Sequence, residues 1–159
     1  MRSVGRKLIA CVAALAACAV AFPGRAGAQD SNAAATLARA ATLTISRPDD
    51  PARVFLDLWV NAYTPPSRGA VEAVVSVGAD RGNAFVEVGR FSVFPSEPFT
   101  ASDARKHRAY RFNATAALAA LKPGEETLNV RIDMVSLIEA IRAEGARLEI
   151  GKATFSARP

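Results

Sequence analysis

The stretch RVFLDLWVNAY, residues 53–63, decides the fold because aliphatic side chains occupy every second position along most of its length. In a β-strand successive side chains point to opposite faces, so residues two apart share a face. One face carries Val54, Leu56, Leu58 and Val60, and the other carries Phe55, Asp57, Trp59 and Asn61. The stretch is therefore predicted to be a strand with one aliphatic face and one mixed face.

Six further stretches show the same period of two, and turn-forming residues separate them. They cover residues 42–46, 71–77, 85–94, 110–112, 128–134 and 147–156. Gly89 interrupts the third, where a bulge or a sharp bend is expected. Short strands with turn signals at intervals of about ten residues predict an all-β fold. We expect an antiparallel β-sandwich, jelly-roll-like, over residues 41–157.

Two short helices are also expected. The first covers residues 116–121 and is capped by Asn113 or Thr115. Asn113-Ala114-Thr115 also matches an N-glycosylation acceptor, although the cap is a sufficient structural reason for it. The second covers residues 136–145, because Ser136-Leu137-Ile138-Glu139 matches a capping box.

The N-terminus has the layout of a secretory signal peptide over residues 1–28. A positive start precedes the apolar run 8–22, and Ala26-Gly27-Ala28 supplies the small residues for cleavage after Ala28. Cys18 lies in a sequence that also fits a lipoprotein box, which would anchor the protein to a membrane. Residues 29–40 are small and polar, and are expected to form a flexible tail. The protein is therefore predicted to be periplasmic or secreted, or alternatively a membrane-anchored lipoprotein.

Removal of the signal peptide changes the charge of the chain. The 159 residues carry a net charge of +5, but four of the 20 basic residues lie in the first 28 positions. The remaining 131 residues hold 16 basic and 15 acidic side chains, a net charge of +1. We therefore expect no nucleic-acid partner, and a membrane partner only through Cys18. Both cysteines also leave with the signal, so a hydrophobic core must stabilise the domain.

The inventory of chemically active residues is small, and we expect a protein without catalytic activity, metal or cofactor. His107 is the one histidine and lies among cations, so it is a weak metal candidate. Met134 alternates with aliphatic residues and is expected to fill the core rather than to bind copper. Asp57 is expected to accept backbone hydrogen bonds, although it could also pair with a second acid in a hydrolase.

Two groups of residues are candidates for binding. Trp59, Tyr63 and Tyr110 could form an exposed aromatic platform for a sugar, and Arg105, Lys106 and Arg108 form a basic cluster. A solvated loop is the competing interpretation of the cluster, since acidic residues precede it. The platform requires that the three rings be coplanar and exposed.

Several motifs, in order, resemble the C-terminal β-sandwich domain of polyphenol oxidases and tyrosinase-like proteins. Residues 56–61 (LDLWVN) are similar to its Phe-Asp-Val-Tyr-Val-Asn strand, and residues 89–95 (GRFSVFP) to its Gly-Ser-Phe-x-x-x-Pro segment. Residues 111–121 are similar to its strand and short helix, and residues 128–135 with 148–151 to its final hairpin. The His-rich copper domain of that family is absent, so no catalytic residue is carried over.

The resemblance implies an exported, non-catalytic accessory domain of the kind that shields the active-site entrance of a copper oxidase. Its partner would be a separately encoded tyrosinase-like copper oxidase or another envelope protein. The alternative is a carbohydrate- or envelope-binding module that uses Trp59, Tyr63 and Tyr110.

Overall fold

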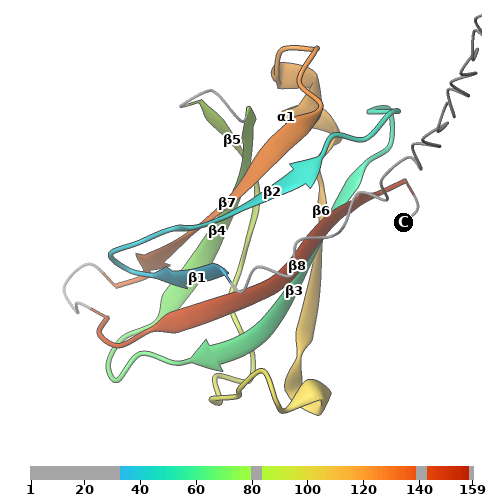
Figure 1. Cartoon of the computed structure of the whole chain (residues 1–159). Coiled ribbons are helices and arrows are strands. Elements are labelled where there is room, and N and C mark those ends of the chain that lie inside the picture. Colours follow the sequence, from blue (N-terminus) through green and yellow to red (C-terminus); the bar gives the residue numbers. More distant parts are fainter. Residues whose placement is uncertain (1–32, 80–83, 139–142, 158–159) are drawn as a thin grey trace, which may run out of the picture.

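The computed structural model describes residues 33–79, 84–138 and 143–157, and within them the protein is a sandwich of two four-stranded sheets (Figure 1). The strands are β1 (Ala33–Thr36), β2 (Ala41–Ser46), β3 (Phe55–Thr64), β4 (Val71–Ala79), β5 (Phe85–Phe91), β6 (Arg108–Asn113), β7 (Thr127–Ser136) and β8 (Arg147–Ser156). A 3₁₀ turn (Ala104–Lys106) precedes β6, and the helix α1 (Thr115–Ala120) follows it. No helix in these ranges is long and apolar enough to cross a membrane.

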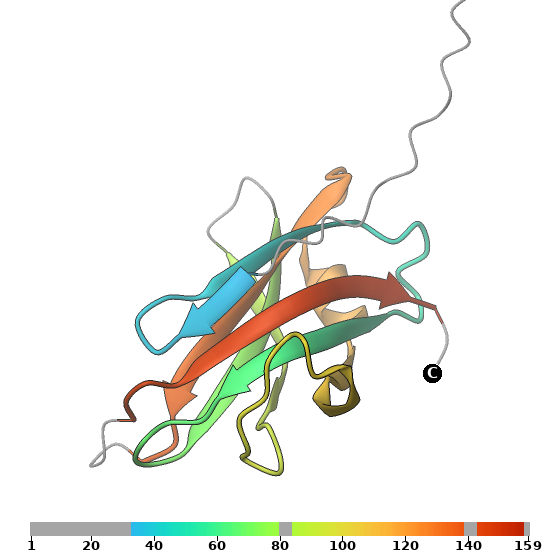
Figure 2. The ribbon, with the colours of Figure 1, turned by 60° about the horizontal axis from the view of Figure 1, so that its bottom comes forward.

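The order of the strands is that of a jelly roll. One sheet has the order β1-β8-β3-β6 and the other β2-β7-β4-β5, and all neighbours are antiparallel. Each strand of the first half of the chain pairs with its mirror in the second half: β1 with β8, β2 with β7, β3 with β6 and β4 with β5. This is the pairing of one long hairpin rolled up into two facing sheets. Figure 2 shows β8 lying between β1 and β3. The expected all-β, jelly-roll-like sandwich is confirmed.

The core lies between the two sheets and is built from the alternating aliphatic positions. The predicted inner face of β3 is almost fully buried, as are the alternating residues of β7. These are Val54, Leu56, Leu58, Val60, Leu128, Val130 and Ile132. Burial of each such side chain contributes about 1.5–3 kcal/mol, which is how a chain without a disulfide in its sandwich can hold two sheets together.

Two bulges at the middle of the β3–β8 pair interrupt the alternation. Trp59 pairs with Lys152, Val60 with Ile150 and Ala62 with Glu149, so Gly151 and Asn61 are each an extra residue. The Asn61 side chain occupies the space where a side chain on Gly151 would lie. The bulge at Asn61 reverses the facing of the residues after it.

The expected bulge at Gly89 is confirmed. The register of β4 against β5 shifts between Val75 and Ser76, opposite Gly89 and Glu87. A Cβ atom at Gly89 would lie 2.5 Å from Cδ1 of Phe112. Glycine is therefore required here because the Phe112 ring packs directly on the backbone of β5.

The helix predicted over residues 116–121 is confirmed, with its start one residue earlier at Thr115. The backbone N–H of Thr115 donates to Asn113 Oδ1 at 3.1 Å, and Thr115 Oγ1 accepts from Val54 N at 3.2 Å. The residue at the helix cap is Ala114, so the predicted cap at Asn113 or Thr115 is wrong, although Asn113 bonds the first helical N–H and Thr115 bonds Val54, which precedes β3.

Several strands extend beyond their predicted bounds, as β4, β6 and β7 do, and three differences change the architecture. Residues 33–40 are not a flexible tail, because β1 pairs along β8 and buries Ala35 completely. The strand predicted over residues 85–94 ends at Phe91. Ser136 is the last residue of β7 rather than a helix cap. The signal peptide, Cys18 and residues 139–142 of the second predicted helix lie outside the described residues.

Candidate functional site

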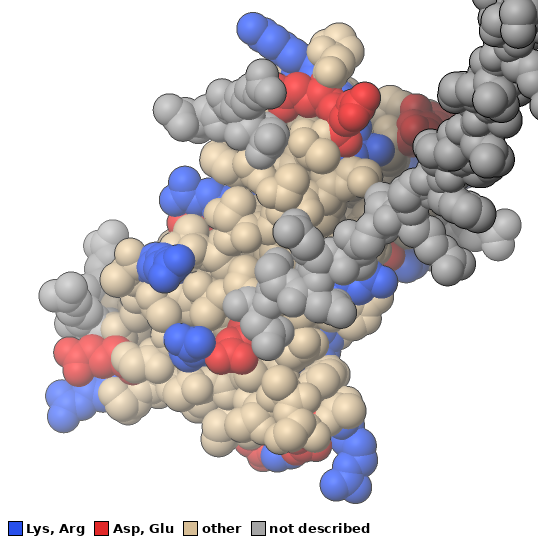
Figure 3. Space-filling model, in the orientation of Figure 1, with Lys and Arg blue, Asp and Glu red and all other residues tan. Residues whose placement is uncertain are grey.

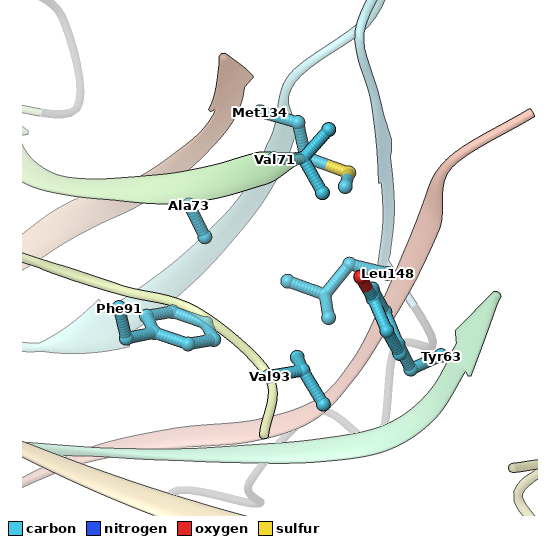
Figure 4. Close-up of a pocket in the computed structure, with 7 residues that line it drawn as sticks. All are labelled: Tyr63, Val71, Ala73, Phe91, Val93, Met134 and Leu148. Carbon is cyan, nitrogen blue, oxygen red and sulfur yellow. The ribbon is translucent and has the colours of Figure 1, made fainter. Parts of the chain in front are cut away.

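The described core between the two sheets has little open space beside Tyr63 and Phe91. Side chains from both sheets point into a cavity of about 10 Å³ (Figure 4). Its lining is Tyr63, Val71, Ala73, Phe91, Val93, Met134 and Leu148. A volume of this size holds about one water molecule, whereas organic ligands occupy pockets of about 300–1,000 Å³. This cavity is therefore not a ligand site, and Met134 fills the core as predicted.

An open hollow of about 700 Å³ lies at one end of the sandwich. It is lined by residues from the β1–β2 turn, the end of β7 and the approach to β8, namely Thr36, Leu37, Ala38, Ser136, Ala143, Glu144, Gly145, Ala146 and Arg147. Residues 139–142, which lie outside the described part of the chain, fall between these lining segments in the sequence. We therefore assign no site to the hollow.

The three aromatic residues proposed as a sugar platform do not lie on one surface. Tyr63 points inward because of the bulge at Asn61; it is 5% exposed, and its ring centroid lies 6.4 Å from that of Phe99. Tyr110 is stacked on Phe91 with 3.9 Å between ring centroids, and burial raises the pKa of its phenol. Trp59 alone faces outward, between the buried Leu58 and Val60 on β3. The prediction of an exposed, coplanar platform of these three rings is therefore wrong.

The carboxylate of Asp57, on β3, bonds side chains of β6 and β8 on the outer face of the sheet β1-β8-β3-β6, which we call the first sheet. Arg111 of β6 donates from Nε to Asp57 Oδ1 at 2.6 Å and from Nη2 to Oδ2 at 3.1 Å. Ser156 of β8 donates from Oγ to Oδ2 at 2.7 Å. These hydrogen bonds, those from Arg111 most of all, hold the pKa of the Asp57 carboxyl below its usual value, and burial opposes them only in part.

The partners of Asp57 differ from both expectations. The carboxylate accepts hydrogen bonds from the side chains of Arg111 and Ser156, whereas backbone donors were expected. These two partners also stand where the hydrolase hypothesis required a second acid. A fork of this kind is typical of a structural ion pair. Sequence reasoning missed the partnership because Arg111 is 54 positions away and meets Asp57 only through the β3–β6 register.

The basic cluster is largely tied into its own loop. Lys106 Nζ lies 3.7 Å from Asp103 Oδ2, and the guanidinium of Arg108 donates to the Lys106 carbonyl and lies over the Phe99 ring. His107 Nε2 lies 3.1 Å from the carbonyl oxygen of Ala101. Arg105 is exposed. The cluster therefore agrees better with the solvated-loop interpretation than with a binding site.

Metal-ligating side chains do not gather in the part of the chain that the structure describes, where no three His, Cys, Asp or Glu residues lie close enough to hold an ion. Charged side chains of both signs are interspersed over the face in Figure 3 rather than gathered by sign. Several are paired across or along strands, such as Arg131 with Asp133 at 2.8 Å and Arg90 with Glu87 at 2.8 Å. The described part of this face therefore shows no large patch of one charge sign.

Phe94 is the exposed feature that sequence reasoning missed. Its side chain is 84% exposed, the most of any large hydrophobic residue in the described ranges. The residues around it hold the loop in place, since Val93 and Phe99 are buried and Phe99 exchanges two backbone hydrogen bonds with Tyr63. Proline at position 95 was the signal that a strand ends before this point.

The described part of the chain is thus a jelly-roll β-sandwich with a closely packed core between its two sheets. No protein-family model matches the chain, and no curated protein matches its sequence.

Proposed function

We propose that this protein is an exported, non-catalytic accessory domain that binds another protein, with a tyrosinase-like copper oxidase as the partner. The export signal read from residues 1–28 and the ordered motifs of residues 56–151 support this proposal. The small size of the cavity beside Tyr63 and Phe91 agrees with a surface role for the described core.

The observation that carries the proposal is Phe94. Phe94 is 84% exposed, and full burial of a phenylalanine side chain contributes about 1.5–3 kcal/mol relative to exposure in water. An interface that covers Phe94 would gain this free energy. Aromatic anchors of this kind contribute much of the affinity at protein interfaces when they enter a pocket of the partner. The loop that presents Phe94 is fixed at Val93 and Phe99, so little conformational entropy is lost on binding.

The test is affinity purification of the tagged protein from the envelope fraction of its native host. Three forms are compared: the wild type, Phe94→Ser, and Leu137→Ser, which alters another exposed apolar residue. The proposal expects a copper oxidase with the wild type and with Leu137→Ser, and its loss with Phe94→Ser. Recovery of no oxidase, or equal recovery with Phe94→Ser, contradicts the proposal.

A further inference from the structure

The outer face of the first sheet carries a regular grid of side chains on its three strands β8, β3 and β6. Residues that pair directly across strands point to the same face. Three rows follow from the registers: Lys152, Trp59 and Ala109; Thr154, Asp57 and Arg111; and Ser156, Phe55 and Asn113. Two aromatic rings therefore lie in line along β3, about 13 Å apart, with polar groups on both sides.

Each ring has a cation beside it. Lys152 Nζ lies 5.4 Å from the Trp59 ring centroid, and the Arg111 guanidinium lies 5.8 Å from that of Phe55. The two cations differ in their other partners. Arg111 is neutralised by Asp57, whereas Lys152 forms no ion pair with any residue that the structure describes. The charge available to a ligand on this grid is thus the ammonium of Lys152.

The indole of Trp59 is partly exposed, and the Lys152 ammonium lies over its ring. Its neighbour on β6 is Ala109, which is exposed and covers little of the ring. The side chain of Asn61, two positions along β3, lies against Gly151 of β8. The result is a partly exposed indole with a cation over its ring, and that cation forms no ion pair with the described residues.

We propose that Trp59 and Lys152 form a binding subsite for an acidic saccharide, in which the sugar ring stacks on the indole and its carboxylate binds the Lys152 ammonium. The grid holds two cations and one acid, so its net charge is +1. This charge suits one carboxylate at a time, and it is too small for a polynucleotide, whose affinity depends on several phosphate contacts. The subsite is independent of the Phe94 loop and of any protein partner.

The single tryptophan of the chain makes the test direct, because the fluorescence of the purified protein reports on Trp59 alone. The probes are hexagalacturonate and the neutral maltohexaose. The variants are Lys152→Gln and, as a control with the same change of charge, Lys122→Gln. We expect a saturable fluorescence change with hexagalacturonate, about tenfold weaker affinity or more with Lys152→Gln, and unchanged affinity with Lys122→Gln.

Calorimetry with Trp59→Ala checks the stacking contact, and circular dichroism of that variant checks its fold. We expect it to lose hexagalacturonate binding while it stays folded, because Trp59 lies on the outside of the sandwich. Three results would each overturn the proposal: no saturable signal, equal weakening by Lys152→Gln and Lys122→Gln, or equal affinity for maltohexaose. Displacement of hexagalacturonate by a single-stranded DNA oligomer at equal affinity would also overturn it.

Discussion

In the ion pair between Asp57 and Arg111, we predict that loss of Arg111 lowers the free energy of unfolding more than loss of the Asp57 charge does. The Asp57 side chain is 11% exposed and the Arg111 side chain 46% exposed. Arg111→Met leaves a carboxylate with little access to water and with Ser156 as its remaining side-chain donor. Asp57→Asn leaves a guanidinium that water can solvate and an amide oxygen that still accepts a hydrogen bond.

The magnitudes follow from this difference in exposure. Loss of the two charge-assisted hydrogen bonds to a poorly solvated carboxylate costs about 2–3 kcal/mol for Arg111→Met. Asp57→Asn costs about 1 kcal/mol, because the cation left behind is half exposed. As a control, Arg147→Met breaks the exposed pair with Glu149 and costs between about 0 and 1 kcal/mol.

The assay is urea unfolding at neutral pH, with the transition midpoint and the slope fitted for each variant. An unchanged slope shows that the free energy of unfolding, rather than the denatured state, has changed. The reasoning is refuted if Arg111→Met costs no more than Arg147→Met, or if Asp57→Asn costs more than Arg111→Met.

Three further predictions concern acid, packing and the exposed loop. Arg111 lowers the pKa of Asp57 below the ordinary 3.8, so the Asp57 carboxylate stabilises the fold above about pH 3.8. That stabilisation is lost as the pH falls through the folded-state pKa. Urea unfolding of the wild type and of Asp57→Asn across this range should therefore show a shrinking difference in their free energies of unfolding. Gly89→Ala should lower the free energy of unfolding by about 1–3 kcal/mol in the same assay, because the new Cβ meets the Phe112 ring. The loss should be smaller in a Phe112→Leu background, and an equal loss in both backgrounds would contradict the packing argument. Phe94→Ser should change the free energy of unfolding by less than about 0.5 kcal/mol, and a larger loss would mean that its ring stabilises the fold.

The alternation of residues 53–63 and 128–134 was sufficient to predict the core strands, because a half-buried strand must place apolar residues at every second position. The same reasoning missed β1, whose sequence Ala33-Ala34-Ala35-Thr36 has no alternation. That strand depends on pairing with β8, and pairing between distant segments leaves no local pattern.

The candidate sites were harder to predict than the fold. Tyr63 appeared to be available for binding until the bulge at Asn61 turned it inward, and a bulge in β3 at an asparagine is not evident from the sequence. The partners of Asp57 and the grid around Trp59 depend on the register of three strands. A shift of one residue in a register moves every side chain to the other face, so composition alone could not give these contacts.

The proposed partner is tested most directly by cross-linking in the native host. A photo-reactive phenylalanine analogue is placed at Phe94 and, in a second strain, at the exposed Leu137, and the cross-linked products are identified by mass spectrometry. We predict one product from position 94 that contains a copper oxidase of the tyrosinase type, and no such product from position 137. Absence of a product at position 94, or products there without an oxidase, would contradict the account of this protein as an accessory domain of that enzyme.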